Sequence, residues 1–197
     1  NSGSDVAADL GALLHVGQDE YDAGFAAGQE LAAMGGTNGL CVNHEVGNVA
    51  LDLRCDGFAE GFGGPVQVLP TTNDPSEIEA KVRASLDSNE EIDTVMALGA
   101  SLAGEPVVAA VNAMGLTGEV MVASFDLSAN FLEAVANGEA AFAIDQQQFL
   151  QGYLPVVFLA MNAQYGLVPG GDVPSGPNLV TQEKAAQVVD LSAQGIR

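Results

Sequence analysis

Short apolar runs alternate with segments of helical periodicity along most of the chain. The runs carry few polar positions, which is typical of strands buried on both faces of a parallel sheet. Such strands are expected at residues 12–16, 40–42, 66–69, 94–98, 119–125, 141–144 and 178–181. Helices are expected between them, at about residues 21–34, 49–58, 75–86, 102–113, 129–136, 149–165 and from 183 onward. This alternation predicts an α/β fold with a doubly wound parallel sheet.

The residues that follow the predicted strands are candidates for a binding site, because ligands of such sheets lie beyond the carboxyl ends of the strands. These ends are rich in amides, hydroxyls and carboxylates. They carry Gln18 and Asp19; Asn43, His44 and Glu45; Thr71 and Thr72; residues 99–101; Asp126; and Asp145 and Gln146.

Three side chains suit the hydroxyl groups of a sugar. A carboxylate such as Asp126 accepts from two hydroxyls, a guanidinium such as Arg54 donates in a fork, and the amide of Gln146 does either. We therefore predict that these residues bind a sugar or related polyol. Plainer roles are a helix start for Asp126, a surface ion pair with Asp52 or Asp56 for Arg54, and a solvated loop amide for Gln146.

The chain offers little for covalent catalysis, so we predict no enzyme. It has no Gly-x-Ser-x-Gly elbow and no pair of histidines at metal-ligand spacing, and we expect neither a metal nor a cofactor. His15, inside an apolar run, is expected to be packed and hydrogen-bonded, and His44 to shape a pocket in preference to acting as a base. Asp126 and Asp145 could pair as acid and base, but binding explains the set more simply.

The charge of the chain is strongly negative. Twenty-six acidic and five basic residues among 197 give a formal net charge of −21. This disfavours nucleic acids and anionic membrane surfaces as partners, and suits solubility or adaptation to salt. No apolar run is long enough to span a bilayer, so no direct membrane insertion is expected, and residues 1–5 do not read as a signal peptide.

Cys41 and Cys55 fall on a predicted strand and on the helix expected to pack over it. A disulfide between them would close a loop of about 15 residues and contribute about 3 kcal/mol. Two buried free thiols explain the sequence equally well.

Four stretches resemble the type I periplasmic sugar-binding proteins, the ribose- and galactose-binding group that serves ABC importers. They are residues 16–24 (VGQDEYDAG), 41–58 (CVNHEVGNVALDLRCDGF), 122–126 (VASFD) and 143–147 (AIDQQ). The resemblance implies two Rossmann-like lobes that close by hinge bending on a sugar held between them. The three crossings between the lobes would fall near Gln18, near Asp145 and within residues 171–177.

The resemblance also assigns the site. Arg54, Asp126 and Gln146 correspond to the family's sugar-contacting arginine, aspartate and hinge glutamine. Gly99 and Ala100 stand where ribose binders often have a polar pair, which argues against a strictly ribose-like ligand. The predicted ligand-binding set is completed by Asn1, Ser2 and His44, of which the first two would end the fourth strand of the first lobe.

The implied domain division is 1–17 for the end of the first lobe, 18–144 for the second lobe, 145–175 for a returning segment of the first and 176–197 for a returning segment of the second. The family's earlier strands and helices, with the aromatic residues that stack on the sugar, would precede Asn1. The chain thus resembles an incomplete first lobe followed by a complete second one, with an open sheet edge.

These features predict the solute-binding component of an ABC sugar importer, which binds a monosaccharide or related polyol without chemistry. Its partner would be the membrane permease, and its location periplasmic or extracellular, free or lipid-anchored. The alternative is the effector-sensing domain of a lac-repressor-type regulator, which would need a basic DNA-binding module upstream. The net charge and the cysteine pair favour the exported binder, while the identity of the sugar and the oligomeric state stay open.

Overall fold

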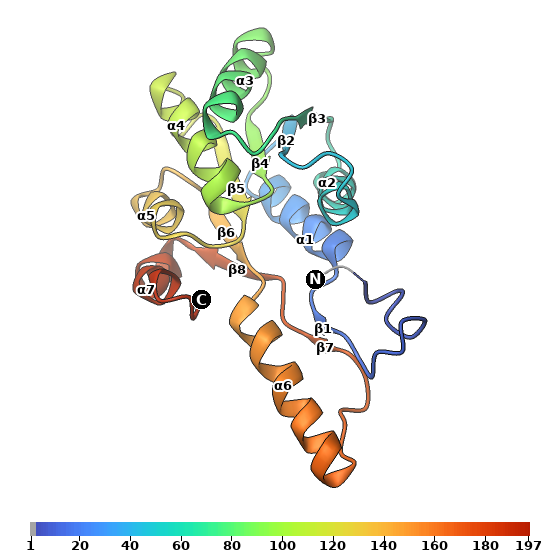
Figure 1. The fold of residues 1–197 in the computed structure, drawn as a ribbon. Coiled ribbons are helices and arrows are strands. Elements are labelled where there is room, and N and C mark those ends of the chain that lie inside the picture. The colour runs from blue at the N-terminus through green and yellow to red at the C-terminus, as the bar shows by residue number, and fades with distance from the viewer. Residues whose placement is uncertain (1–2) are drawn as a thin grey trace.

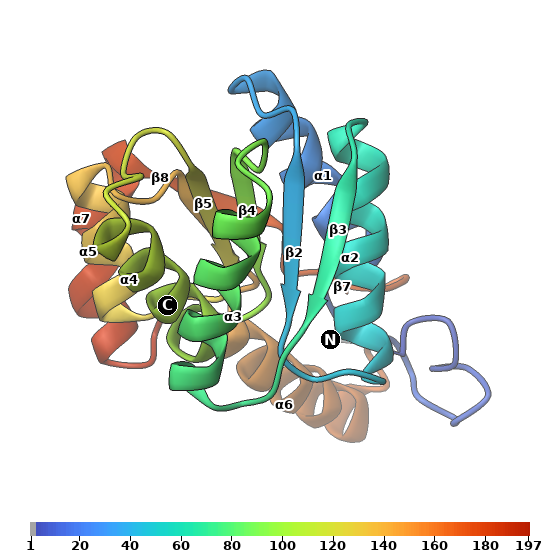
Figure 2. The ribbon, with the colours of Figure 1, turned by 90° about the horizontal axis from the view of Figure 1, so that it is seen from above.

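A computed structural model describes residues 3–197 and shows a six-stranded sheet with helices on both faces (Figures 1 and 2). The strand order is β3-β2-β4-β5-β6-β8. The strands are β2 (Gly39–Asn43), β3 (Val66–Pro70), β4 (Thr94–Ala97), β5 (Met121–Phe125), β6 (Phe142–Asp145) and β8 (Asn178–Thr181). The predicted doubly wound α/β fold is confirmed.

One edge of the sheet departs from the prediction, because β8 runs antiparallel to β6. Asn178, the first residue of β8, pairs with Asp145, the last residue of β6. The chain leaves the sheet at the carboxyl end of β6, and β8 begins beside that same end. It therefore runs back along β6 in the opposite direction. All the other neighbouring strands of this sheet pair in parallel.

The helices form two layers that enclose separate cores. Leu40 and Val42 face one core, whereas Cys41, between them in β2, faces the other, as the alternation of side chains along a strand requires. Figure 2 shows the two layers on opposite sides of the sheet. One layer consists of α1 (Glu20–Ala33) and α2 (Val49–Phe62). The other consists of α3 (Pro75–Ser88), α4 (Glu105–Ala113), α5 (Ala129–Asn137) and α7 (Gln182–Ala193).

Helices α1 and α2 pack backbone to backbone through glycines. A Cβ atom placed on Gly57 would lie 2.1 Å from the carbonyl oxygen of Tyr21, and one placed on Gly24 would lie 2.3 Å from that of Arg54. Only residues without a side chain permit so close an approach. The contact brings the first turn of α1 beside the middle of α2.

A disulfide joins Cys41 of β2 to Cys55 of α2, with a Cα–Cα distance of 5.8 Å. This decides between the two interpretations that the sequence left open. The bond ties α2 to the sheet one residue after Arg54. It therefore restricts where that arginine can lie.

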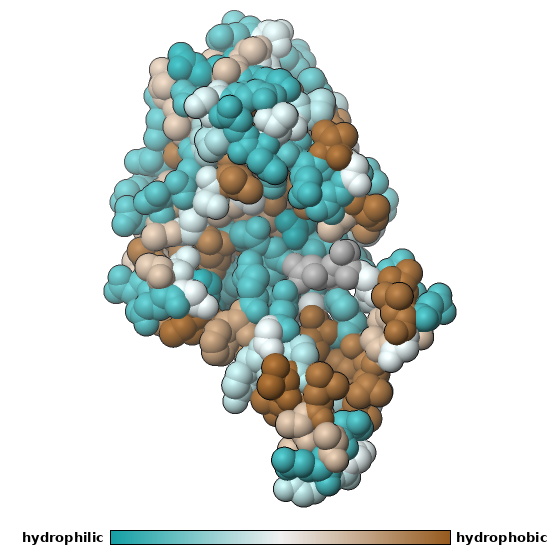
Figure 3. Space-filling view, viewed as in Figure 1, coloured by the Kyte–Doolittle hydropathy of each residue, from teal (hydrophilic) through white to brown (hydrophobic). Residues whose placement is uncertain are grey.

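A smaller unit projects away from the sheet (Figure 1). It comprises β1 (Val16–Gly17) and β7 (Val173–Pro174), which pair in parallel, and the helix α6 (Gln148–Tyr165). No residue of α6 is fully buried, and Figure 3 shows hydrophobic surface over this part of the molecule. Between residues 3 and 197, no helix combines the length and the apolar composition needed to cross a membrane.

Two local predictions were wrong. The strand expected at residues 12–16 is only Val16–Gly17, because β7 offers a partner to those two residues alone. His15 consequently lies outside a strand and is partly exposed. Its backbone N–H donates to Asp172 Oδ1 at 2.7 Å. The helix expected from residue 102 begins earlier, as the π-helical turn η1 (Ala100–Gly104), followed by α4. Pro106 lacks the N–H that a regular α-helix would use at that point.

Candidate binding site

The carboxyl edge of the sheet brings most of the predicted residues together. His44 follows β2, Gly99 follows β4, Asp126 follows β5 and Gln146 follows β6, while Arg54 reaches the same edge from α2. Gly99 lies between two of them: a Cβ atom placed on it would be 3.1 Å from His44 Cε1 and 3.8 Å from Asp126 Oδ2.

Three further residues belong to the predicted set. Ala100 opens η1 and is buried, 2% exposed. Asn1 and Ser2 lie outside the described residues, so their contacts stay a prediction.

Arg54 is buried and held on several sides. Its Nε donates to Glu20 Oε2 at 2.7 Å, its Nη2 to Glu20 Oε1 at 3.1 Å, and its Nη1 to the carbonyl of Leu98 at 3.0 Å. Its Cζ lies 4.3 Å from the ring centroid of Phe125, a cation–π contact. The surface ion pair considered from the sequence is therefore wrong. Asp52 instead accepts a hydrogen bond from the side chain of Asn43.

Asp126 is bonded to two glutamines. Its Oδ1 accepts from Gln146 Nε2 and from Gln148 Nε2, the latter at 2.9 Å. Burial raises the pKa of the Asp126 carboxyl, while the guanidinium of Arg54 and the amide of Gln146 act in the opposite direction. Ser128 caps the following helix by accepting from the N–H of Phe131, so Asp126 is not needed as its cap.

Three buried polar atoms at this edge have no hydrogen-bond partner within residues 3–197. They are Gln18 Oε1, His44 Nδ1 and Gln146 Oε1. Burial lowers the pKa of His44, the carboxylate of Glu45 opposes this shift and the guanidinium of Arg54 adds to it; the pKa is lowered on balance, so the ring is neutral at neutral pH. An unpaired buried polar atom costs about 1–3 kcal/mol, so a ligand that offers hydroxyl groups would be stabilised here. Figure 3 shows hydrophilic surface between the body of the sheet and the smaller unit.

The three connections between the sheet and the smaller unit meet beside these atoms. The N–H of Ser175 donates to the carbonyl of Gly17, and Gln147 Nε2 donates to the carbonyl of Ser175, each at 2.8 Å. A Cβ atom placed on Gly176 would lie 2.8 Å from Gln18 Oε1 and 3.0 Å from the carbonyl of Asp145. These segments are the ones in which crossings were expected.

Asp145 serves the same junction and is fully buried. Its Oδ2 accepts from Arg197 Nη2 at 2.6 Å and from Nε at 2.8 Å, and its Oδ1 accepts from the N–H of Gln147 at 2.8 Å. Both oxygens are thus engaged in holding the chain. This arrangement gives no support to an acid–base pair of Asp145 with Asp126.

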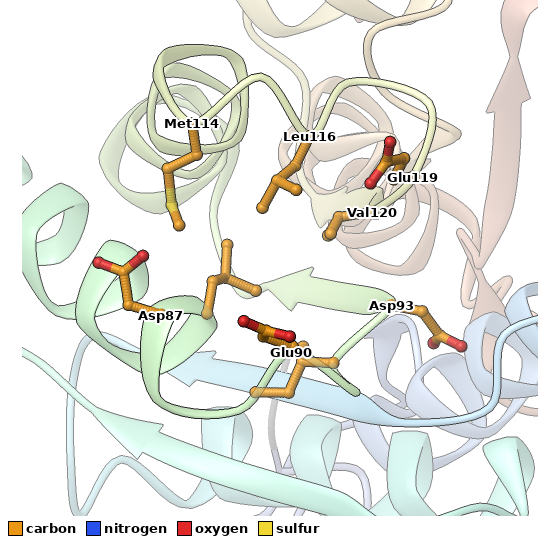
Figure 4. A pocket seen from close by; sticks show the side chains of 9 residues that line it. Asp87, Glu90, Asp93, Met114, Leu116, Glu119 and Val120 are labelled. Carbon is orange, nitrogen blue, oxygen red and sulfur yellow. The ribbon is translucent and has the colours of Figure 1, made fainter.

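Another hollow lies at the opposite edge of the sheet, beside the amino ends of β4 and β5 (Figure 4). It measures about 510 Å³ and is lined by Asp87, Glu90, Asp93 and Glu119 among apolar side chains. Asp93 already accepts from the N–H groups of Thr37 and Asn38. In the described part of the chain, no cluster of His, Cys, Asp or Glu could hold a metal ion. The candidate site therefore remains at the carboxyl edge.

Comparison with known families decides the class of protein. The model of the periplasmic binding protein domain matches residues 3–166. The chain belongs to the periplasmic binding protein family. The predicted resemblance to its type I sugar-binding group is confirmed. No curated protein matches the chain.

Solved structures of periplasmic binding proteins superpose on the whole chain or nearly so. A carbohydrate transporter from Acidothermus cellulolyticus 11B, in complex with myo-inositol, is 32% identical, with a TM-score of 0.90 over 100% of this chain and 69% of that one. A periplasmic ribose ABC transporter from Conexibacter woesei is 20% identical, with a TM-score of 0.81 over 95% and 65%. The chain thus spans about two thirds of the length of these binding proteins.

The sequence analysis missed Glu20 and Gln148 as members of this site. Glu20 stood in the stretch that follows the first strand, but no role was assigned to it. A buried arginine needs a carboxylate, which was a usable signal. With twenty-six acidic residues in the chain, that signal does not say which one.

Proposed function

We propose that this binding protein is the solute-binding component of an ABC sugar importer and takes a monosaccharide or related polyol at the carboxyl edge, without chemistry. The observation that carries the proposal is the convergence of Arg54, Asp126 and Gln146 beside buried acceptors that lack donors. The myo-inositol complex of the relative that is 32% identical supports a polyol as ligand.

Each residue has a role in this proposal. A hydroxyl both donates and accepts, so Asp126 and the Oε1 of Gln146 would accept from the ligand. The N–H groups of Arg54 not bonded to Glu20 or Leu98 would donate to it. His44, Gly99 and Ala100 would shape the wall, and Asn1 and Ser2 would add contacts from the opposite lobe.

Closure would bend the junction between the sheet and the smaller unit. In this proposal, residues 18–144 and 176–197 form one lobe, and residues 1–17 and 145–175 belong to the other. The membrane permease of the importer would recognise the closed form. The disulfide supports a location outside the cytoplasm, because such bonds persist in oxidising compartments. A lac-repressor-type regulator, which acts in a reducing cytoplasm, fits less well.

Alanine substitutions in the full-length protein test this proposal. Pentoses, hexoses and inositols are first screened by thermal shift, and the best ligand is titrated by calorimetry. Arg54→Ala and Asp126→Ala should each weaken binding by about 1.5–3 kcal/mol or more, because each removes charge-assisted hydrogen bonds.

Arg83→Ala and Asp87→Ala are the matched controls, since both side chains are exposed and lie away from the carboxyl edge. The controls should bind like the wild type. Equal affinity in the wild type and in Arg54→Ala would refute the site.

A further inference from the structure

Glu20 holds two of the side chains at the candidate site. It is the first residue of α1 and is 3% exposed. Its Oε2 accepts from Arg54 Nε at 2.7 Å and from Gln18 Nε2 at 3.0 Å, and its Oε1 accepts from Arg54 Nη2 at 3.1 Å. The glycine contacts between α1 and α2 keep this carboxylate and the guanidinium side by side.

These bonds determine which atoms remain for a ligand. The Nε of Arg54 donates to Glu20, one N–H of Nη1 donates to the carbonyl of Leu98, and the ring of Phe125 lies against the guanidinium. The remaining N–H groups of Nη1 and Nη2 are therefore the ones that can reach a ligand. Glu20 also occupies the Nε2 of Gln18, which leaves the Oε1 of that amide as an unpaired acceptor. One carboxylate thus orients both a donor and an acceptor.

The same carboxylate removes the positive charge that an anion would need. Arg54 is balanced by Glu20, and Arg197, the other arginine at this edge, is balanced by Asp145. Asp126 carries either no charge or a negative one, and the His44 ring is neutral at neutral pH because its pKa is lowered. In neither protonation state of Asp126 does the edge carry a positive excess.

The remaining basic residues do not alter this balance. Lys81 and Arg83 lie on α3, each in an ion pair with a glutamate of the same helix, and Lys184 lies on α7. The formal net charge of −21 adds a long-range repulsion of anions. Among the described residues of the carboxyl edge, a carboxylate or phosphate group on the ligand would therefore find no uncompensated cation.

We infer that Glu20 is the positioning residue for Arg54 and Gln18 and the residue that restricts the site to uncharged polyols, excluding uronates and sugar phosphates. This inference rests on the proposed sugar-binding function. Two of its consequences can be separated by substitution. The charge of Glu20 should govern the discrimination between neutral and anionic ligands, and its length should govern the affinity for neutral ones.

The test uses the full-length protein and pairs of ligands that differ in charge: glucose and glucuronate, galactose and galacturonate, and myo-inositol and its monophosphate. Calorimetry should show that the wild type binds the neutral member of its preferred pair about 100-fold tighter or better. Glu20→Gln should reduce this ratio by about tenfold or more, because it leaves Arg54 with an uncompensated charge.

Glu20→Asp keeps the charge but shortens the side chain. It should preserve the ratio and weaken the neutral ligand by about tenfold, and it also covers the case in which Glu20→Gln fails to fold. Glu77→Gln is the matched control: it removes one carboxylate from an exposed ion pair on α3 and should change neither quantity.

Three results would overturn the inference. If the wild type binds the anionic member of a pair more tightly than the neutral one, the inference about Glu20 is wrong, while the proposed sugar binding stands. A Glu20→Gln protein that loses both ligands by the same factor shows a merely structural role. A wild type that binds no member of any pair removes the proposed function, and the inference with it.

Discussion

Asp126 is expected to favour ligand binding at a cost to the stability of the folded protein. Its backbone adopts a left-handed conformation, with φ of 68°, which aspartate and asparagine tolerate better than most residues. Burial raises the pKa of its carboxyl, so the ionised form is costly in the folded chain. A ligand hydroxyl that donates to the Asp126 carboxylate would offset part of this cost.

Replacing Asp126 by asparagine should stabilise the protein at neutral pH. Asparagine suits the backbone and still offers an oxygen to Gln146 and Gln148. In the wild type the folded state keeps the proton of Asp126 to higher pH than the unfolded state does. The free energy of unfolding therefore falls as pH rises from 3.8, the ordinary pKa, through the raised pKa of the folded state. The Asn variant escapes this loss.

Denaturant unfolding from acid to neutral pH measures the effect. The gain of Asp126→Asn over the wild type should be absent below pH 3.8 and reach its full value above the folded pKa, while polyol affinity falls by about 1.5–3 kcal/mol. Asp87→Asn, on an exposed residue, controls for the change in net charge. A wild type as stable as Asp126→Asn at neutral pH, after that correction, would contradict the prediction.

The sequence predicts the meeting of Arg54, Asp126 and Gln146 because parallel strands end at one edge and polar residues follow each end. It does not predict the partner of Arg54. Glu20 and Arg54 are 34 residues apart on different helices. Their contact depends on how α1 packs on α2, and neither helix contains a pattern that identifies the pair.

At the scale of elements, the glycines between α1 and α2 are the contact on which the site depends. Gly57→Ala would place a Cβ atom 2.1 Å from the backbone of Tyr21, which cannot give way as a side chain tip does. We expect the helices to separate and the free energy of unfolding to fall by about 1–3 kcal/mol or more. Polyol affinity should fall too, because the separation parts Glu20 from Arg54.

Gly152→Ala is the matched control for this substitution, measured by urea unfolding. Gly152 lies within α6, and a Cβ atom placed on it meets nothing within 4 Å. Alanine should therefore raise the free energy of unfolding by about 0.5–1 kcal/mol through its higher helix propensity. If both variants shift stability by the same amount and in the same direction, the close approach of α1 and α2 is not what Gly57 provides.

Most strands and helices follow from the sequence because each is a buried apolar run or an amphipathic segment with a recognisable start. The errors concern features that a segment does not determine by itself. The length of β1 depends on β7, and the direction of β8 depends on the path of the chain after Asp145. The π-helical turn at Ala100–Gly104 precedes Pro106, which lacks the N–H for a helical hydrogen bond, and the apolar pattern of the segment does not predict this irregular turn.

At the scale of the molecule, the acidic surface should make stability depend on salt. A net charge of −21 on 197 residues produces repulsion that is strongest in the compact state. Raising the ionic strength screens this repulsion, while the buried pair of Arg54 and Glu20 is screened much less. We expect the Tm to rise by at least about 2–4 °C, equivalent to about 1 kcal/mol at this size.

Thermal unfolding in sodium chloride and in potassium chloride at matched ionic strength measures this dependence. Screening predicts the same rise in both salts. A Tm that rises in neither salt would count against repulsion as the cause.

The pairing of β1 with β7 has a consequence for how the chain folds. Val16 pairs with Val173, which is synthesised much later, so this pair cannot form until Val173 has left the ribosome. Strands β2 to β6 and their helices can assemble earlier, since each pairs with a neighbour made soon before or after it. The smaller unit is therefore expected to be completed after the sheet, and a nascent chain halted before residue 173 should carry a folded sheet in which Val16 and Gly17 are still unpaired.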